Sequence, residues 1–150
     1  MSNGGSAGTG GDWAAQRTEA AAIQAQRLAA RQNAEHERAE ALLASFLPVV
    51  TTRGPKPVDL IVQGYGGQGT ARSKLRGWYL RNNRTCALGT DGKFYVLIAP
   101  LNRFHPSWLK VDVQPTRPPL IIGEGGKDGD TIDLAEALER ILPGWLGGRS

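Results

Sequence analysis

The longest stretch without a helix-breaking residue runs from residue 12 to residue 47. It is built mainly from Ala, Gln, Arg, Glu and Leu, and Pro48 follows it. These residue types have high helix propensities, and Asp12 is a suitable N-cap. The pattern predicts one helix over 12–47, about 52 Å long at 1.5 Å per residue. Such a helix is too long to lie against a small domain, so we expect much of it to project or to meet a partner.

A stripe of mostly small residues follows this helix at heptad spacing, and Gln32 and Glu35 interrupt it. An Ala-rich stripe allows close helix approach but buries little area, so any coiled coil should be weak. The last turns are more apolar and should dock on the folded domain. A solvated helix with a docked end and a dimerising helix both remain open. The residues expected to carry an interaction are Ala21, Ala25, Leu28, Ala39, Leu42 and Phe46.

Beyond the helix, apolar residues alternate with polar ones as they do in strands. A first strand is predicted over Val58–Gln63, and residues 75–99 predict three more, joined by two-residue turns at Asn82-Asn83 and Asp91-Gly92. Both faces of this meander are apolar, so the sheet should be covered on both sides or strongly curled. The register places Trp78, Leu80, Thr85, Ala87, Phe94, Val96 and Ile98 on one face, and Tyr79, Cys86, Leu88, Tyr95 and Leu97 on the other.

The remaining pattern completes an α+β prediction. Trp108–Gln114 and Leu120–Ile122 read as strands, and Ile132–Leu142 reads as a helix capped by Asp130 or Thr131. The predicted fold is a long N-terminal helix, a small, mostly antiparallel sheet of about five strands and a short C-terminal helix. The predicted organisation is a disordered tail over 1–11, the helix over 12–47, a linker over 48–57, the α+β domain over 58–146 and a tail over 147–150.

Composition narrows the cellular setting. The 150 residues include one cysteine, Cys86, which cannot form an internal disulfide and suits a reducing compartment. No apolar run approaches the roughly 18 residues of a membrane span, and the N-terminus does not resemble a secretory signal. We therefore expect a cytoplasmic protein with no membrane partner.

The positive charge is concentrated in the middle of the chain. Residues 53–110 carry ten of the 18 Lys and Arg against two acidic residues. This asymmetry predicts either an anionic partner or internal neutralisation by the acidic C-terminal part. Basic residues also alternate with aromatic ones over 72–103, a combination that can neutralise phosphates and stack bases. The candidate nucleic-acid-binding residues are Arg72, Lys74, Arg76, Arg81, Arg84 and Lys93.

A G-x-G-x-x-G pattern formed by Gly64, Gly66 and Gly69 follows the first predicted strand. In dinucleotide-binding folds such glycines let the backbone approach a pyrophosphate. Here Gly64–Ser73 reads as a polar loop, the following Thr70–Lys74 is too short for a crossover helix before the next strand, and no acidic residue stands about 20 positions on. A mobile loop is the simpler interpretation, and a phosphate loop is the alternative.

Other reactive residues form no recognisable set. His36 begins a His-Glu pair on the helix without a second histidine one turn on, and His105 is isolated in a loop. Cys86 lies within a predicted apolar strand, where cysteine is usually inert. We therefore predict no catalytic residues, no metal and no cofactor.

Short stretches also carry a resemblance. Gly77-Trp78-Tyr79-Leu80-Arg81, the run from Gly89 to Leu97 and Gly125-Gly126-Lys127-Asp128-Gly129 are together similar to small uncharacterised actinobacterial proteins, over roughly 58–142. This resemblance implies an intracellular bacterial protein and supplies no activity or site residue.

Taken together, these features predict a non-enzymatic interaction protein that uses its long helix for self-association or for docking a protein partner. The alternative is a nucleic-acid-binding domain that uses the basic segment 72–103. Nucleotide binding at residues 64–69 is a third hypothesis.

Overall fold

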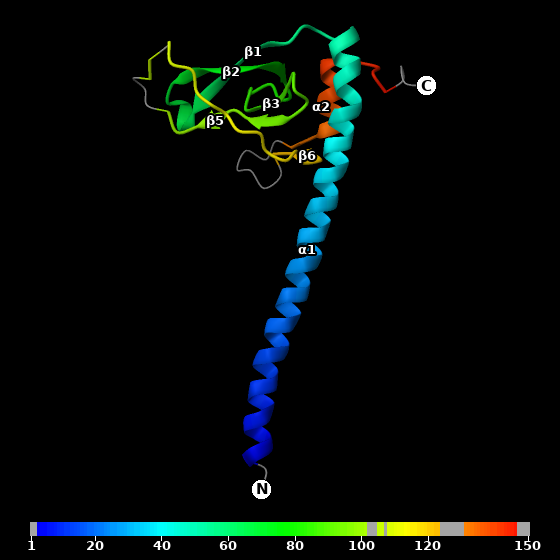
Figure 1. The fold of residues 1–150 in the computed structure, drawn as a ribbon, viewed down its shortest axis with the longest axis vertical. Helices are drawn as coiled ribbons and strands as arrows, with labels where there is room; N and C mark the ends of the chain where they lie inside the picture. The colour runs from blue at the N-terminus through cyan, green and yellow to red at the C-terminus, as the bar shows by residue number, and fades with distance from the viewer. Residues whose placement is uncertain (1–2, 102–104, 107, 124–130, 147–150) are drawn as a thin grey trace. The chain divides into compact units, whose positions relative to one another are not determined.

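The computed structural model describes residues 3–101, 105–106, 108–123 and 131–146, with side chains from residue 11 onward. The chain divides into two units, residues 1–35 and residues 36–150. Helix α1 (Asn3–Arg53) contributes to both, and the second unit adds two sheets and helix α2 (Leu134–Ile141) (Figure 1). The predicted α+β fold is confirmed, with a long N-terminal helix, a five-stranded, mostly antiparallel sheet and a short C-terminal helix.

The main sheet has the strand order β4-β3-β2-β1-β5, in which only the β1–β5 pair is parallel. A short 3₁₀ turn, η1 (Tyr65–Gly67), follows β1, and β6 and β7 form a separate antiparallel pair. The strands are β1 (Val58–Gly64), β2 (Thr70–Tyr79), β3 (Cys86–Gly89), β4 (Phe94–Val96), β5 (Ile98–Ala99), β6 (Ile121–Ile122) and β7 (Ile132–Asp133).

Leu97 closes the main sheet on itself. It is the one residue between β4, at one edge of the sheet, and β5, at the other. Its N–H donates to the carbonyl of Thr85 at 2.8 Å, and its own carbonyl accepts the N–H of Gln63 at 2.9 Å. One run of chain thus joins both edges, and the strands curl around a small interior (Figure 1).

Both faces of the curled sheet are apolar, as predicted. The inner face is filled by a buried cluster of Leu60, Val62, Ala87, Tyr95 and Leu97. The outer face packs against the end of α1, against α2 and against Trp145. These elements and the outer face together form a second buried cluster. The residues that β2, β3, β4 and their flanking positions contribute to it are Trp78, Leu80, Cys86, Leu88 and Phe94.

The end of α1 docks on the second cluster through residues spaced four, three and four apart. These are Ala39, Leu43, Phe46 and Val50, all almost fully buried. The ring of Phe46 meets the ring of Trp145 edge to face, with 5.0 Å between centroids and 82° between planes. This geometry suits the charge distribution of aromatic rings. The expectation that the apolar last turns anchor the helix is therefore confirmed.

Helix α1 continues past Pro48 to Arg53, so the predicted linker 48–57 is helical in its first half. Proline removes one backbone donor and normally bends or ends a helix. Here Pro48 is exposed, while Val50 is fully buried in the core and its carbonyl accepts the N–H of Gly54 at 2.9 Å. Packing of the residues after the proline offsets the lost hydrogen bond.

At its other end α1 begins at Asn3 rather than at Asp12, over residues predicted to form a disordered tail. The second predicted tail, residues 147–150, lies outside the described residues. The side chains between Gly11 and Ala34 are all exposed.

Both connections in the 75–99 meander are longer than the predicted two-residue turns. Residues 81–85 form the first, closed by a 2.9 Å bond from the Leu80 N–H to the Cys86 carbonyl. Residues 90–92 form the second, closed by a 2.9 Å bond from the Gly89 N–H to the Lys93 carbonyl. Gly92 has φ 83°, which fits a three-residue hairpin loop ending in the left-handed conformation.

Compared with the predicted pairing, each longer connection shifts the register by one residue, and such a shift moves the side chains of a strand to the opposite face. Strand β3 follows one shift, so its side chains change face. Strand β4 follows two shifts, so its side chains keep the predicted face. Trp78 pairs with Leu88, and Leu88 pairs with Phe94. Cys86 and Leu88 therefore lie on the Trp78 face and Ala87 lies on the opposite face, so the predicted faces of these three residues were wrong.

Three further boundaries differ from the prediction. The stretch Trp108–Gln114 forms only an isolated bridge, Ser73 with Val111, among the described residues. The predicted loop Gly64–Ser73 is shorter, because β2 begins at Thr70. The C-terminal helix starts at Leu134, since Ile132 and Asp133 first pair with β6.

The Phe46–Trp145 contact gives a stability prediction. We expect Trp145→Ala to lower the free energy of unfolding by about 3–5 kcal/mol, because it leaves a large cavity in the core. The matched control is Trp108→Ala, whose side chain is 80% exposed and whose loss should cost less than about 0.5 kcal/mol. Urea unfolding followed by circular dichroism would measure both variants. Equal losses for the two tryptophans would contradict the packing described above.

Candidate functional site

Three of the predicted basic residues form a stripe on strand β2. Arg72, Lys74 and Arg76 are exposed and alternate with buried Ala71 and Ser73. The register between β1 and β2 shifts between Asp59 and Ile61. There the Ser73 hydroxyl donates a hydrogen bond to the Leu60 carbonyl at 2.7 Å. The stripe is therefore a fixed feature of the strand.

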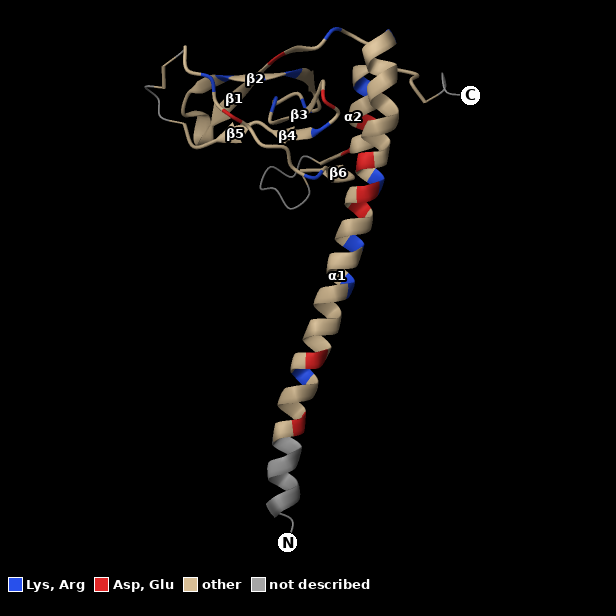
Figure 2. Ribbon diagram, in the orientation of Figure 1, with Lys and Arg blue, Asp and Glu red and all other residues tan. Residues whose placement is uncertain are grey.

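Two members of this stripe have acidic neighbours. The Arg76 side chain lies 3.4 Å from Asp59, and Lys74 lies 3.8 Å from Asp112. All four side chains are mostly exposed, and such surface ion pairs contribute about 0–1 kcal/mol. Basic and acidic positions are interspersed over the second unit (Figure 2). Of these two ion pairs, the Lys74 pair involves the C-terminal part of the chain, and the Arg76 pair joins two neighbouring strands.

The other predicted basic residues lie elsewhere. Arg81 and Arg84 belong to the connection between β2 and β3, and Lys93 belongs to the connection between β3 and β4. The Arg84 guanidinium lies over the ring of Tyr79, 5.5 Å from its centroid. Arg84 also has φ 60°, a conformation that is costly for a side chain other than glycine. The six predicted residues therefore do not form one surface element.

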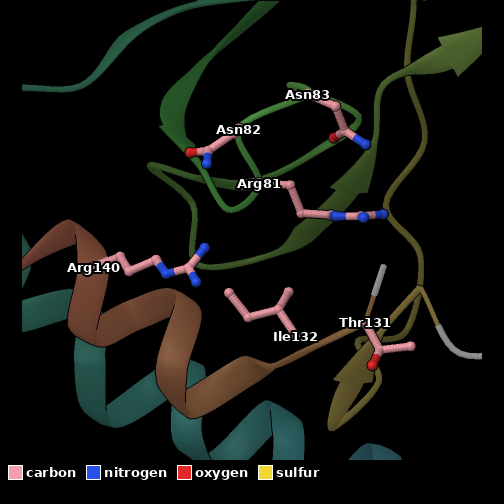
Figure 3. A pocket seen from close by; sticks show the side chains of 6 residues that line it. All are labelled: Arg81, Asn82, Asn83, Thr131, Ile132 and Arg140. Atoms are coloured by element: carbon pink, nitrogen blue, oxygen red, sulfur yellow. The ribbon is translucent and has the colours of Figure 1, made fainter. Parts of the chain in front are cut away.

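The connection 81–85 forms one wall of a pocket of about 330 Å³. Figure 3 shows Asn82 and Asn83 on the loop side, Thr131 and Ile132 on the other, and Arg140 reaching from α2 towards the loop. We call this pocket the arginine groove. Its lining residues are Arg81, Asn82, Asn83, Thr131, Ile132 and Arg140.

A second depression of about 310 Å³ adjoins the arginine groove, since the two share Arg81, Asn82 and Arg140. Tyr79, Arg84 and Ile141 are among its other lining residues. Within the part of the chain that the structure describes, the residues that line the two depressions are basic or uncharged. Sequence reasoning identified Arg81 and Arg84 but not Arg140, because nothing local to residue 140 indicates that α2 lies beside this loop.

The three glycines of the predicted phosphate loop have backbone roles. A Cβ atom at Gly64 would lie 2.1 Å from the carbonyl oxygen of Gln68, so no larger residue fits there. Gly66 and Gly69 have φ 62° and 84°, in the region that glycine adopts easily. The loop links two antiparallel strands and precedes no helix, so it lacks the βαβ context of a dinucleotide site.

The six residues of the predicted interaction stripe fall into two groups. Ala21, Ala25 and Leu28 are exposed, and Leu28 is 57% exposed. In contrast, Ala39 and Phe46 are fully buried in the core, and Leu42 packs against it. Only the first group is available to another molecule.

Both histidines bond to backbone carbonyls. Nδ1 of His36 lies 2.8 Å from the Pro118 carbonyl, and Nε2 of His105 lies 2.8 Å from the Leu109 carbonyl. Since a carbonyl only accepts, each of these nitrogens carries the proton. Beside His36, Arg117 pairs with Glu40 at 2.7 Å and fastens the same segment to α1. Among the described residues, no group of three His, Cys, Asp or Glu side chains is arranged to hold a metal ion.

Comparison of the chain with protein-family models, with curated proteins and with solved structures gives no match. The resemblance to actinobacterial proteins therefore stays a prediction. Over the described residues, no helix combines the length and the apolar character needed to cross a membrane.

Cys86 is a buried thiol, and burial raises its pKa from 9.0 to about 11, although Arg81 and a hydrogen bond with Thr85 lower it to a smaller extent. An unfolded chain would lose this proton near pH 9, and the folded chain only near pH 11. We expect the stability that this difference confers to be complete below pH 9 and to be lost between about pH 9 and 11. Native Cys86 should also react slowly with a thiol reagent at pH 8.

Unfolding midpoints across pH 8–11 would measure this loss, with Cys86→Ala as the comparison. Burial also raises the pKa of Tyr95 from 10.0 to about 12, and its hydrogen bond with Asp91 adds to the shift. The Cys86→Ala variant should therefore lose stability only above about pH 10, where Tyr95 loses its proton in the unfolded chain. Rapid labelling of native Cys86 would show that the thiol is accessible and would contradict its burial.

Proposed function

We propose that the protein acts as an interaction protein through residues 11–34 of helix α1, with a second copy of the same chain as its partner. The observation that carries this proposal is the exposure of every side chain in that stretch. Trp13, Ile23 and Leu28 are 57%, 43% and 57% exposed. Large apolar side chains in water favour association, because their contact removes apolar area from solvent.

The composition of the stretch also supports pairing of like helices. Ala14, Ala21 and Ala25 lie on the same stripe as Leu28, and small residues let two helix backbones approach closely. The stretch contains three arginines against two acidic residues, so two copies would repel each other little. A shared stripe on both copies satisfies the self-complementarity of a twofold dimer. The free thiol of Cys86 is consistent with a cytoplasmic setting.

Sedimentation analysis of the full chain tests this proposal. We expect a mass that rises with concentration towards a dimer. Replacing Ala21 and Ala25 together by Glu should weaken association by at least roughly tenfold, about 1.4 kcal/mol, because each copy would bring two charges into the contact.

The matched control replaces Ala30 and Ala34 by Glu, which adds the same charge at the same spacing on the opposite side of the helix. The control should associate like the unmodified chain. A monomer at every concentration would sink the proposal, and a monomer that binds a different protein through the same stripe would replace it with partner docking.

A second candidate function is nucleic-acid binding, which the β2 stripe favours. Arg72, Lys74 and Arg76 project from one strand, and the ion pairs of Lys74 and Arg76 are weak enough for phosphates to replace. We expect binding of single-stranded DNA or RNA that falls steeply as salt rises.

Fluorescence anisotropy at several salt concentrations would measure this binding. Replacing Arg72 and Arg76 by Gln should lower affinity at low salt and reduce the salt dependence. Replacing Arg38 and Arg53 by Gln removes the same charge from α1 rather than from β2 and should have a smaller effect. Undetectable binding at low salt would exclude this function.

A further inference from the structure

Among the described residues, Trp108 is the large apolar side chain with the greatest exposure, 80%. It lies in a turn that two hydrogen bonds close. The Leu109 N–H donates to the Pro106 carbonyl at 3.1 Å, and Nε2 of His105 donates to the Leu109 carbonyl at 2.8 Å. These bonds hold the backbone around Trp108, so contact with another molecule would remove a large apolar area from water without first ordering the turn.

The segment after Trp108 runs along the start of β2 (Figure 1). The Val111 N–H donates to the Arg72 carbonyl at 2.8 Å, and Val111 forms a parallel bridge with Ser73. In such a bridge the preceding residues of the two chains lie side by side, on the opposite face from the bridged pair. Lys110 therefore lies beside Arg72 on the exposed side of β2, and Trp108 is two positions before Lys110.

The ion pair between Lys74 and Asp112, 3.8 Å apart, shows the same alignment on the other side of the bridge. Among the residues that the structure describes, Arg72 and Lys110 form no ion pair of this kind. The sequence also contains no acidic residue over 60–90 or over 92–111. Two cations thus lie close to an exposed indole, and we call the surface formed by Arg72, Lys110 and Trp108 the Trp108 corner.

A single nucleic-acid strand offers both groups that this corner would contact, because its phosphates attract cations and its bases stack on aromatic rings. In a duplex the bases stack on one another, so their faces are closed to Trp108. A flat anionic surface, such as a membrane, would also meet Asp59 and Asp112, which lie beside Arg76 and Lys74. A narrow strand avoids these carboxylates, and the corner therefore fits a strand better.

The aromatic residues within the basic segment 72–103 are less suited to stacking. Trp78, Phe94 and Tyr95 are buried, and the Arg84 guanidinium already lies over the ring of Tyr79. The base contact of a nucleic-acid site on β2 must therefore come from outside those four positions.

We propose that the Trp108 corner is the base-stacking part of a single-stranded nucleic-acid site, in which the indole of Trp108 stacks on a base and Arg72 and Lys110 bind neighbouring phosphates. This inference rests on the second candidate function, nucleic-acid binding by the β2 stripe, and adds the residue that contacts the bases. Every base has a face that stacks, so the site has little sequence preference.

Fluorescence anisotropy of a labelled oligothymidylate with the full chain, at several salt concentrations, tests the site. Trp108→Ala should raise the dissociation constant roughly tenfold at each salt concentration, because it removes stacking and no charge. The salt dependence should stay that of the unmodified chain, whereas Arg72→Gln should reduce it. Trp108→Phe keeps an aromatic ring and should bind within about threefold of the unmodified chain.

Two controls separate stacking from charge and from general surface effects. Inorganic polyphosphate has a charged backbone and no bases, so Trp108→Ala should bind it as the unmodified chain does. Val58→Ala removes another exposed apolar side chain, opposite Gly77 at the far end of the β1–β2 pair, and should leave oligothymidylate binding unchanged. A thermal melt would verify that each variant is folded.

Failure of this inference is distinguishable from failure of the second candidate function. Absence of oligothymidylate binding by the unmodified chain at low salt would reject both. Binding that depends on Arg72 but not on Trp108 would reject the stacking role alone, and so would equal weakening of oligothymidylate and polyphosphate binding by Trp108→Ala. Binding of phosphatidylserine–phosphatidylcholine vesicles through Trp108, without binding of oligothymidylate, would assign the corner to a membrane surface instead.

Discussion

The structure of the second unit depends on the closure of its sheet at Leu97. A sheet of strands this short leaves two edges whose backbone groups need partners. Leu97 bonds to Thr85, next to β3, and to Gln63 on β1, so the run Phe94–Ala99 pairs with β3 at its start and with β1 at its end. Closure also requires strong curvature, and the inner cluster around Leu60 and Tyr95 is what fills the resulting interior. Backbone pairing and apolar packing therefore specify the same curled sheet.

Closure limits where function can lie. The inner face is occupied by the domain's own apolar side chains, and the docked part of α1 together with α2 covers the Trp78 side of the outer face. Among the described residues, the stripe of β2, the loop beside α2 and the exposed residues 11–34 are accessible to a partner.

The sequence was sufficient for the main helices and for the meander, but not for the predicted strand Trp108–Gln114 or for the register of the sheet. Propensity and periodicity predicted α1, the meander and α2, because these signals act over a few residues. The faces of Cys86, Ala87 and Leu88 depended on turn length, and the Asn-Asn and Asp-Gly pairs were compatible with more than one length. Likewise, Pro48 signalled a helix end, yet burial of Val50 outweighed it. In both cases tertiary packing decided what local preference left open.

The arginine groove could not be predicted for a related reason. Its two arginines are 59 residues apart in the chain, and they share a pocket only because α2 packs on the outer face of the sheet. Sequence reasoning grouped Arg81 with the arginines of β2, since they are neighbours along the chain. In the structure Arg81 instead lines a pocket together with Arg140, from the acidic C-terminal part. Charge concentration along a sequence therefore indicates that an anion is a plausible partner, whereas the site itself is defined by which walls the fold brings together.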